Sequence, residues 1–118
     1  MRYTPEELSH AIAKAASSKK AKDLVILHMH ELTTTTDFFV IGSANTATQT
    51  RAIADAIEEN LRNEGIEPLH IEGYREGEWI LLDYGDCVAH VFLTESRAFY
   101  ALEKLWGEAP SETYEDEV

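Results

Sequence analysis

Cys87 and His90 are the two residues of the sequence that most resemble a catalytic pair, a thiol followed closely by an imidazole. A histidine beside a cysteine can lower the pKa of the thiol and produce a nucleophilic thiolate. The two residues stand three positions apart in an apolar segment, and side chains three apart on a strand point to opposite faces. We therefore expect no direct activation, and we expect Cys87 to pack as a small apolar side chain.

Two further pairs contain an imidazole. His28 and His30 share one strand face if the strand extends that far, and two imidazoles can begin a metal site. No other His or Cys is obviously close and Glu31 points the other way, so a polar strand end is favoured and no metal is expected. Asp83 and His90 are a possible dyad on one sheet face. The sequence shows no nucleophile or pocket beside them, so a structural or interface hydrogen bond is favoured.

Gly42-Ser43 follows a β-rich run and precedes a long helical pattern, which resembles the phosphate-facing turn of nucleotidyltransferases. That chemistry also needs two metal ions held by strand-borne carboxylates, usually in an Asp-x-Asp motif. The sequence contains no Asp-x-Asp motif, and it also lacks a Walker loop, a Gly-x-Ser-x-Gly elbow and a Rossmann glycine triplet. We therefore expect a helix-capping turn, no cofactor and no enzymatic activity.

The composition of the 118-residue chain excludes several classes of protein. Hydrophobic residues make up 44% of it, enough for one packed domain, and the formal net charge is −12. Contacts with DNA phosphates or anionic membranes need dense Lys and Arg, so we expect neither partner. The sequence has no apolar run of roughly 20 residues and begins without the apolar stretch of a signal peptide, so a cytoplasmic location is expected. The acidic excess favours a basic partner.

Periodicity and capping signals predict the elements that would position these residues. Thr4, Pro5 and Glu7 form a capping-box pattern at the start of the first helix. The expected order is that helix to about residue 20, strands over 23–29 and 37–41, a helix from Asn45 or Thr46 to Gly65, strands over 69–73, 78–84 and 87–93, and a helix over 95–106. We therefore expect an α/β fold with helices packed on a mixed sheet of about five strands.

The C-terminal segment differs in composition from the rest of the chain. Residues 107–118 contain several acids and no Lys or Arg, and they have almost nothing to bury. Such a segment does not gain enough from burial to offset the entropy of ordering it. We therefore expect a single domain over residues 1–106 and an acidic, disordered tail over residues 107–118.

The clearest local signal is a hairpin around Gly85-Asp86, because a two-residue loop that opens with Gly fits a primed turn. Counting outward from that loop pairs Tyr84 with Cys87 and Trp79 with Phe92, and directly opposed residues share a sheet face. One face is then nearly all apolar, with Ile80, Leu82, Tyr84, Cys87, Ala89 and Val91. The other face is mixed, with Trp79, Leu81, Asp83, Val88, His90 and Phe92.

The mixed face is the best indication of function. Aromatic residues beside an acid and an imidazole fit a solvated face poorly, and they fit either a second core layer under a helix or a partner-binding patch. The expected last helix adds to it: its buried stripe is Ala98, Phe99, Leu102, Leu105 and Trp106, which leaves Arg97, Tyr100 and Lys104 on the opposite side. Tyr100 is thus a further candidate anchor, and the choice between core and patch stays open.

Several motifs resemble the ribosomal silencing factor family, also called RsfS or Iojap-like. The most specific are Asp83-x-Gly85-Asp86-x-Val88-x-His90-Val91 and Arg97-x-x-Tyr100-x-Leu102-Glu103-x-Leu105-Trp106, and the segments at Thr36–Ser43 and Ile53–Glu58 match as well. The resemblance covers about residues 5–106. It departs from the family pattern mildly at Cys87, where a β-branched residue is common, and at Phe92, which varies.

The resemblance implies a function without chemistry. Members of the family bind the large ribosomal subunit through a ribosomal protein on its inter-subunit face, block joining of the small subunit and lower translation when nutrients are short. Their fold resembles that of nucleotidyltransferases without the catalytic carboxylates. Organellar relatives assist assembly of the large subunit, so an assembly factor is the alternative here, and a nucleotide-binding enzyme is a more distant one. The absence of a transit peptide favours the bacterial role.

The resemblance also implies which residues bind the partner. Carried over position by position, it makes Trp79 and Tyr100 the first candidates for contact with a basic ribosomal protein. The other candidates on the mixed face and the last helix are Leu81, Asp83, His90, Phe92 and Arg97. An exposed hairpin edge or the mixed face is also suited to a homodimer of the free protein, in which the ribosome-binding patch would be hidden.

Overall fold

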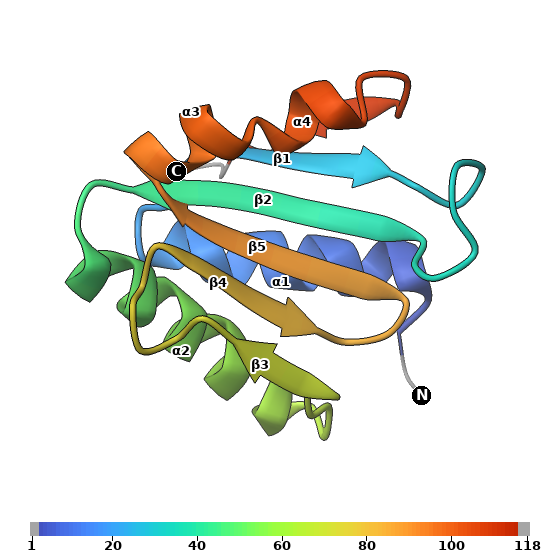
Figure 1. The fold of residues 1–118 in the computed structure, drawn as a ribbon. Coiled ribbons are helices and arrows are strands. Elements are labelled where there is room, and N and C mark those ends of the chain that lie inside the picture. The colour runs from blue at the N-terminus through green and yellow to red at the C-terminus, as the bar shows by residue number, and fades with distance from the viewer. Residues whose placement is uncertain (1–2, 116–118) are drawn as a thin grey trace.

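The computed structural model describes residues 3–115, which form one six-stranded mixed sheet with helices on both faces (Figure 1). The strand order across the sheet is β3-β4-β5-β2-β1-β6. Along the chain the elements are α1 (Pro5–Ser18), β1 (Lys22–His28), β2 (Phe38–Ala44), α2 (Ala47–Asn63), β3 (His70–Glu72), β4 (Trp79–Asp83), β5 (Cys87–Leu93), α3 (Thr94–Tyr100), α4 (Leu102–Leu105) and β6 (Ser111–Thr113). The predicted α/β class is confirmed.

Side-chain caps fix the starts of the two long helices. The Oγ1 atom of Thr4 accepts a hydrogen bond from the Glu7 amide (3.1 Å), and the Glu7 carboxylate accepts one from the Thr4 amide (2.9 Å). This is the predicted capping box. Thr46 caps α2 by accepting from the Gln49 amide at 3.1 Å. Both helices pack on the same face of the sheet, where they cover the main hydrophobic core (Figure 1).

The β4–β5 hairpin has the register that counting from its turn predicts. Trp79 lies opposite Phe92, and the pairing continues residue by residue to Asp83 opposite Val88. Gly85 has a φ of +85°, a conformation that glycine adopts without steric cost. The Asp83 carboxylate accepts a hydrogen bond from the Gly85 amide at 2.8 Å and so supports the turn. A short turn and an adjacent side chain therefore fix which residues share the mixed face.

The predicted turn at Gly42-Ser43 does not form, because the strand continues through both residues. β2 runs to Ala44 and pairs in parallel with β5 along its whole length, so Gly42 lies opposite Val91. A Cβ atom at Gly42 would lie 2.9 Å from Cδ2 of Leu24, and Ser43 is buried. Helix α2 begins only after Thr46. The glycine therefore serves close packing inside the sheet and does not face a helix N-terminus.

The segment after Trp106 differs from the expected disordered tail. Residues 111–113 form β6, which pairs antiparallel with the outer edge of β1 and makes the sheet six-stranded rather than five-stranded. Two histidines hold it by side-chain contacts: Nε2 of His10 and Nε2 of His28 each lie 3.0 Å from the Glu112 carboxylate. Main-chain pairing and these two contacts order the segment despite its acidity. Residues 116–118, the end of the predicted tail, lie outside the described residues.

The predicted single C-terminal helix is broken at Ala101, which adopts a left-handed conformation (φ 48°, ψ 50°). The break divides the helix into α3 and α4 and rotates the expected apolar stripe out of register. Phe99 and Leu105, which were expected to be buried, are 81% and 72% exposed. Leu102 is buried as expected, in a second, smaller core on the face of the sheet opposite α1 and α2. The α3–α4 unit therefore covers only part of this face.

Candidate partner-binding surface

Four of the predicted site residues meet on the mixed face. The Trp79 ring lies 4.9 Å from the ring of Phe92 and 4.8 Å from that of Tyr100, between ring centroids. Its Nε1 atom donates a hydrogen bond to Nδ1 of His90 at 3.0 Å. Phe39 of β2 completes the group, with its ring 4.5 Å from that of His90. We call these five residues the aromatic face.

The aromatic face has a buried floor and an accessible rim. Phe92 and His90 are 0% and 4% exposed, so neither can be the main contact of a partner. Trp79 is half-buried and Tyr100 is 51% exposed. The floor of the mixed face is thus a second core layer, as one interpretation predicted, and its rim is exposed, so that partner binding there stays a prediction.

His90 is a neutral imidazole in the floor of this face. Burial lowers its pKa from the ordinary value of 6.5 to about 4. Because Nδ1 accepts from the Trp79 indole, the hydrogen-bond network assigns the ring proton to Nε2. That atom is buried and has no hydrogen-bond partner in the described part of the chain. His90 therefore orients the indole and contributes no charge at neutral pH.

Leu81 and Asp83 lie further along β4, toward the hairpin turn. Both are half-buried, and Leu81 is opposite His90 across the ladder. The Asp83 carboxylate is engaged by the Gly85 amide and lies 3.7 Å from Nε2 of His70, whereas the His90 Nδ1 atom is bonded to Trp79. The structure therefore pairs Asp83 with His90 neither as a dyad nor through the structural hydrogen bond that was favoured, because each residue bonds a different neighbour.

Arg97 precedes Tyr100 by three residues in α3, and its side chain is directed into the protein. Its side chain is only 11% exposed, and it forms an ion pair of 2.7 Å with Glu103 of α4. Its remaining hydrogen bonds reach β1 and β2. The sequence grouped Arg97 with the residues that touch a partner, but the structure places its guanidinium under α3 and not on the rim.

Sequence reasoning missed two features of this surface. Phe39 was not a candidate, because the parallel pairing of β2 with β5 that brings it beside His90 leaves no local signal in the sequence. Phe99 was assigned to the core, but its ring is exposed and lies 5.1 Å from that of Tyr100. The exposed apolar surface at Tyr100 therefore extends along α3, and an unbroken helical wheel could not reveal it.

The other candidate chemical groups are placed apart from this surface. Cys87 is buried, its Sγ donates to the Pro5 carbonyl at 3.2 Å, and burial raises its pKa to about 12. A thiolate at neutral pH is therefore disfavoured. His28 binds Glu112, and no group of three His, Cys, Asp or Glu side chains within residues 3–115 is arranged to hold a metal ion. No helix within those residues is long and apolar enough to cross a membrane.

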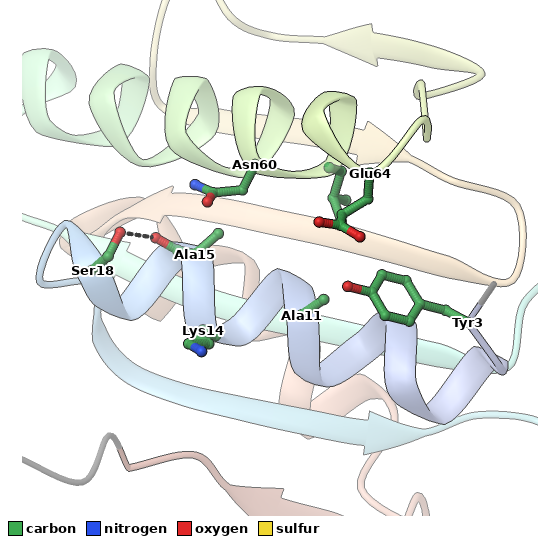
Figure 2. A pocket seen from close by; sticks show the side chains of 8 residues that line it. Tyr3, Ala11, Lys14, Ala15, Ser18, Asn60 and Glu64 are labelled. Atoms are coloured by element: carbon green, nitrogen blue, oxygen red, sulfur yellow. Dashed lines mark hydrogen bonds between the residues drawn. The ribbon is translucent and has the colours of Figure 1, made fainter.

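An open groove lies between α1 and α2 (Figure 2). These two helices cover the main core, on the face of the sheet opposite the aromatic face. Ala11 and Ala15 leave room for the groove because their side chains are small. Tyr3 and Glu64 line one end of the groove (Figure 2). Its position on the helical layer separates it from the residues that the family resemblance implicates.

Comparisons with known proteins show which family the sequence resembles. The family model described as "Ribosomal silencing factor during starvation" matches residues 3–118. The ribosomal silencing factor RsfS of Halalkalibacterium halodurans is 42% identical over 106 residues, which cover 90% of this chain and 91% of that protein. The chloroplastic protein Iojap of Zea mays is 38% identical over 84% of this chain and 43% of its own length.

Solved structures give the same result for the fold. A crystal structure of a protein from Chromobacterium violaceum superposes with a TM-score of 0.87 at 31% identity, covering 89% of this chain and 88% of that chain. A crystal structure of a protein from Bacillus halodurans gives 0.80 at 39% identity, covering 94% and 99%. The family is named for a regulatory role on the ribosome and not for catalysis. The chain belongs to the ribosomal silencing factor family.

Proposed function

We propose that this protein binds the large ribosomal subunit through a basic ribosomal protein on the inter-subunit face, blocks joining of the small subunit and represses translation when nutrients are limited. The observation that carries the proposal is the rim of the aromatic face. Trp79 and Tyr100 lie side by side, partly exposed, in a chain whose family is named for ribosome silencing during starvation.

The aromatic rim has the properties of an interface anchor. Binding energy at protein interfaces concentrates in a few Trp, Tyr and Arg side chains that a partner can desolvate. Trp79 is held rigidly by His90 below it and by Phe92 beside it, so little side-chain entropy is lost when a partner covers it. Phe99 extends the exposed apolar area along α3. A protein loop or edge can therefore dock here without much rearrangement.

The net charge of −12 supports a partner that is basic because it lies on RNA. Opposite charges accelerate encounter and help to orient the two surfaces, while the apolar rim supplies the desolvated contact. Added salt should therefore slow association and weaken binding only in part. The same charge disfavours direct contact with the phosphate backbone of the ribosomal RNA.

Silencing by this route needs no chemical step. A folded body of about 34 × 32 × 31 Å seated on the inter-subunit face occupies space that the small subunit requires. Occupied large subunits are removed from the joining equilibrium by mass action. The extent of inhibition then follows occupancy, and nucleotide has no part in it.

The direct test is a sucrose-gradient profile of purified subunits mixed with increasing amounts of protein, with and without nucleotide. We expect fewer joined ribosomes in proportion to the occupancy of the large subunit, without any need for nucleotide. Ribosomes that are already joined should resist, because the contact surface is covered. Normal joining at saturating occupancy, or inhibition that requires nucleotide, would contradict the proposal.

Matched variants test whether the aromatic face is the contact. Tyr100→Ala removes an exposed aromatic ring from the rim and should weaken binding to large subunits about tenfold or more. Tyr74→Ala is the control, because Tyr74 is also an exposed tyrosine, at 41%, and its hydroxyl is bonded to Asp55 of α2, away from the rim. Equal binding by the two variants would assign the contact to another surface.

A role in large-subunit assembly is the second candidate. A murine relative named "Mitochondrial assembly of ribosomal large subunit protein 1" is 31% identical over 75% of this chain and 40% of its own length. Sedimentation of cell extract separates the two roles. A silencing factor should sediment with mature large subunits, whereas a dedicated assembly factor should be confined to immature particles.

The free protein is also proposed to form a homodimer through the aromatic rim. Such a dimer would compete with ribosome binding, because both would cover Trp79 and Tyr100. Light scattering of wild-type and Tyr100→Ala protein over a range of concentrations tests this. A dimer that is unaffected by the substitution would be formed by another surface.

A further inference from the structure

Arg97 uses its whole guanidinium group within the protein. Nε and Nη2 donate to the two carboxylate oxygens of Glu103, at 3.2 and 2.7 Å. Nη2 also donates to the Asp23 carbonyl at 2.8 Å. Nη1 donates to the Lys22 carbonyl at 3.2 Å and to the Ser43 hydroxyl at 3.1 Å. A guanidinium has five N–H groups, and these bonds account for all of them. Arg97 therefore has no donor left for a partner.

The bonds of Arg97 join α3, α4 and the sheet. Helix α3 has 7 residues and α4 has 4, which is too short for either to be stable by itself. The chain turns between them at Ala101, in a left-handed conformation that costs a residue with a side chain about 1 kcal/mol. The fork from Arg97 to Glu103 spans this turn and sets the angle between the two helices.

The same bonds tie α3 to the sheet. The carbonyls of Lys22 and Asp23 lie at the start of β1, and Ser43 lies near the end of the neighbouring strand β2. Tyr100 follows Arg97 by one helical turn, and its ring lies 4.8 Å from that of Trp79. The position of the Tyr100 ring on the rim thus depends on where Arg97 fixes α3.

We infer that Arg97 and Glu103 form a positioning pair that places Tyr100 against Trp79, and that Arg97 does not itself touch the ribosomal partner. This inference rests on the proposed function, because it concerns how the proposed contact surface is assembled. Lysine cannot replace Arg97 in this role, since an ammonium lacks the planar fork that meets a carboxylate at two points. Glu103 is as important as Arg97, although it belongs to a different helix.

Two conservative substitutions and their combination separate positioning from direct contact. Arg97→Lys keeps the positive charge, and Glu103→Gln keeps the size and removes the negative charge. If the two residues act as one pair, each substitution should weaken binding to large subunits by a similar factor, on the order of tenfold, and the double variant should be little worse than either. Arg62→Lys and Glu58→Gln are the matched controls, because they alter an exposed Arg–Glu pair on α2.

Nuclear Overhauser effects between the Trp79 and Tyr100 rings provide a readout in the free full-length protein. They should weaken in Arg97→Lys and in Glu103→Gln and persist in both α2 controls, while amide spectra confirm that each variant is folded. Loss of binding in Arg97→Lys alone, with the ring contact intact, would show a direct contact and overturn the inference.

The failure of the inference and that of the proposed function are distinguishable. If both variants bind normally while Tyr100→Ala binds weakly, the positioning role is wrong and the proposed contact surface stands. If Tyr100→Ala also binds normally, the proposed contact is wrong, and the ring contact in the free protein still decides whether Arg97 and Glu103 position Tyr100.

Discussion

The indole of Trp79 donates its only N–H to Nδ1 of His90, 3.0 Å away and directly beneath the accessible rim. An indole has one donor and no acceptor, so this bond leaves the Trp79 ring to act by its apolar surface alone. His90 in turn is held neutral by burial, which lowers its pKa to about 4. The aromatic face therefore rests on an imidazole that stays neutral over the physiological range.

His90 should make the domain sensitive to acid in a defined window. Its pKa is about 4 in the folded protein against 6.5 in an unfolded chain, so below pH 6.5 the unfolded state takes up a proton that the native state refuses. The free energy of unfolding should fall between pH 6.5 and 4, by about 3 kcal/mol at most from this residue. Urea unfolding at a series of pH values measures the slope. His90→Phe should lack the part of this slope that comes from His90. An equal slope in the variant and the wild type would mean that His90 has the same pKa in the folded and unfolded states.

Trp79→Phe isolates the indole–imidazole bond. The substitution keeps a ring beside Phe92 and Tyr100 but leaves the buried Nδ1 of His90 without a donor. We expect a loss of about 1–2 kcal/mol in unfolding free energy, the cost of an unsatisfied buried polar atom. His90 should also take up a proton more readily, because Nδ1 is free to accept it, and histidine NMR shifts followed with pH would show this. Unchanged stability would mean that another group replaces the indole.

Removal of the C-terminal strand should destabilise the domain. Ending the chain after Trp106 deletes Ala109 from the second core and exposes the edge of β1 that β6 now covers. We expect a lower melting temperature, in contrast to the small effect that the composition of the segment alone suggests. Scanning calorimetry of the truncated and full-length proteins compares them, and equal melting temperatures would mean that β6 contributes no net stability.

The contacts of Glu112 should hold β6 best between two pH limits. The Glu6 carbonyl and the Glu112 carboxylate raise the pKa of His10, so its contribution is present below its unfolded pKa and is lost as the pH rises through the raised value. Hydrogen bonds from His28 and His10 lower the pKa of Glu112, so its contribution is lost as the pH falls through the lowered value. The Tyr114 amide donates to the Leu24 carbonyl of β1 at 2.9 Å, and its protection against hydrogen exchange, corrected for the intrinsic rate at each pH, should be greatest between these limits in the wild type. In Glu112→Gln the exchange should be faster, with a weaker dependence of protection on pH.

Ala101 offers a test of the helix break. Ala101→Gly relieves the left-handed strain and should change the unfolding free energy by less than about 1 kcal/mol, because the unfolded chain also gains freedom. Ala101→Val places a β-branched side chain at a φ of 48° and should destabilise the domain by clearly more. Chemical denaturation of the two variants compares them, and equal stability would indicate that α3 and α4 can merge into one helix.

Local signals predicted local structure well. The capping box at Thr4 and the turn at Gly85 each depend on residues only a few positions apart, and both the helix start and the hairpin register were confirmed. The composition of the mixed face followed from that register alone. Trp79, His90 and Phe92 could therefore be grouped correctly before any contact between strands distant in sequence was known.

Features that depend on distant segments could not be predicted in this way. Parallel pairing of β2 with β5 brings Phe39 to His90, and nothing near Phe39 in the sequence encodes it. β6 is ordered by pairing with β1 and by the two histidines on Glu112, which outweighs its acidic composition. Nothing local marks the break at Ala101, which the bond from Arg97 to Glu103 spans, so a helical wheel assigned Phe99 to the wrong side.

Both edges of the sheet are closed by very short strands. β3 and β6 have three residues each, and each carries a glutamate that is engaged by a histidine of the same protein. A long, apolar edge would offer unpaired amides and carbonyls to a second chain and invite growth into fibres. Short edge strands that carry a charged side chain resist such growth. In this chain β6 covers the outer side of β1, which would otherwise be an open edge of seven residues, and so protects it from self-association.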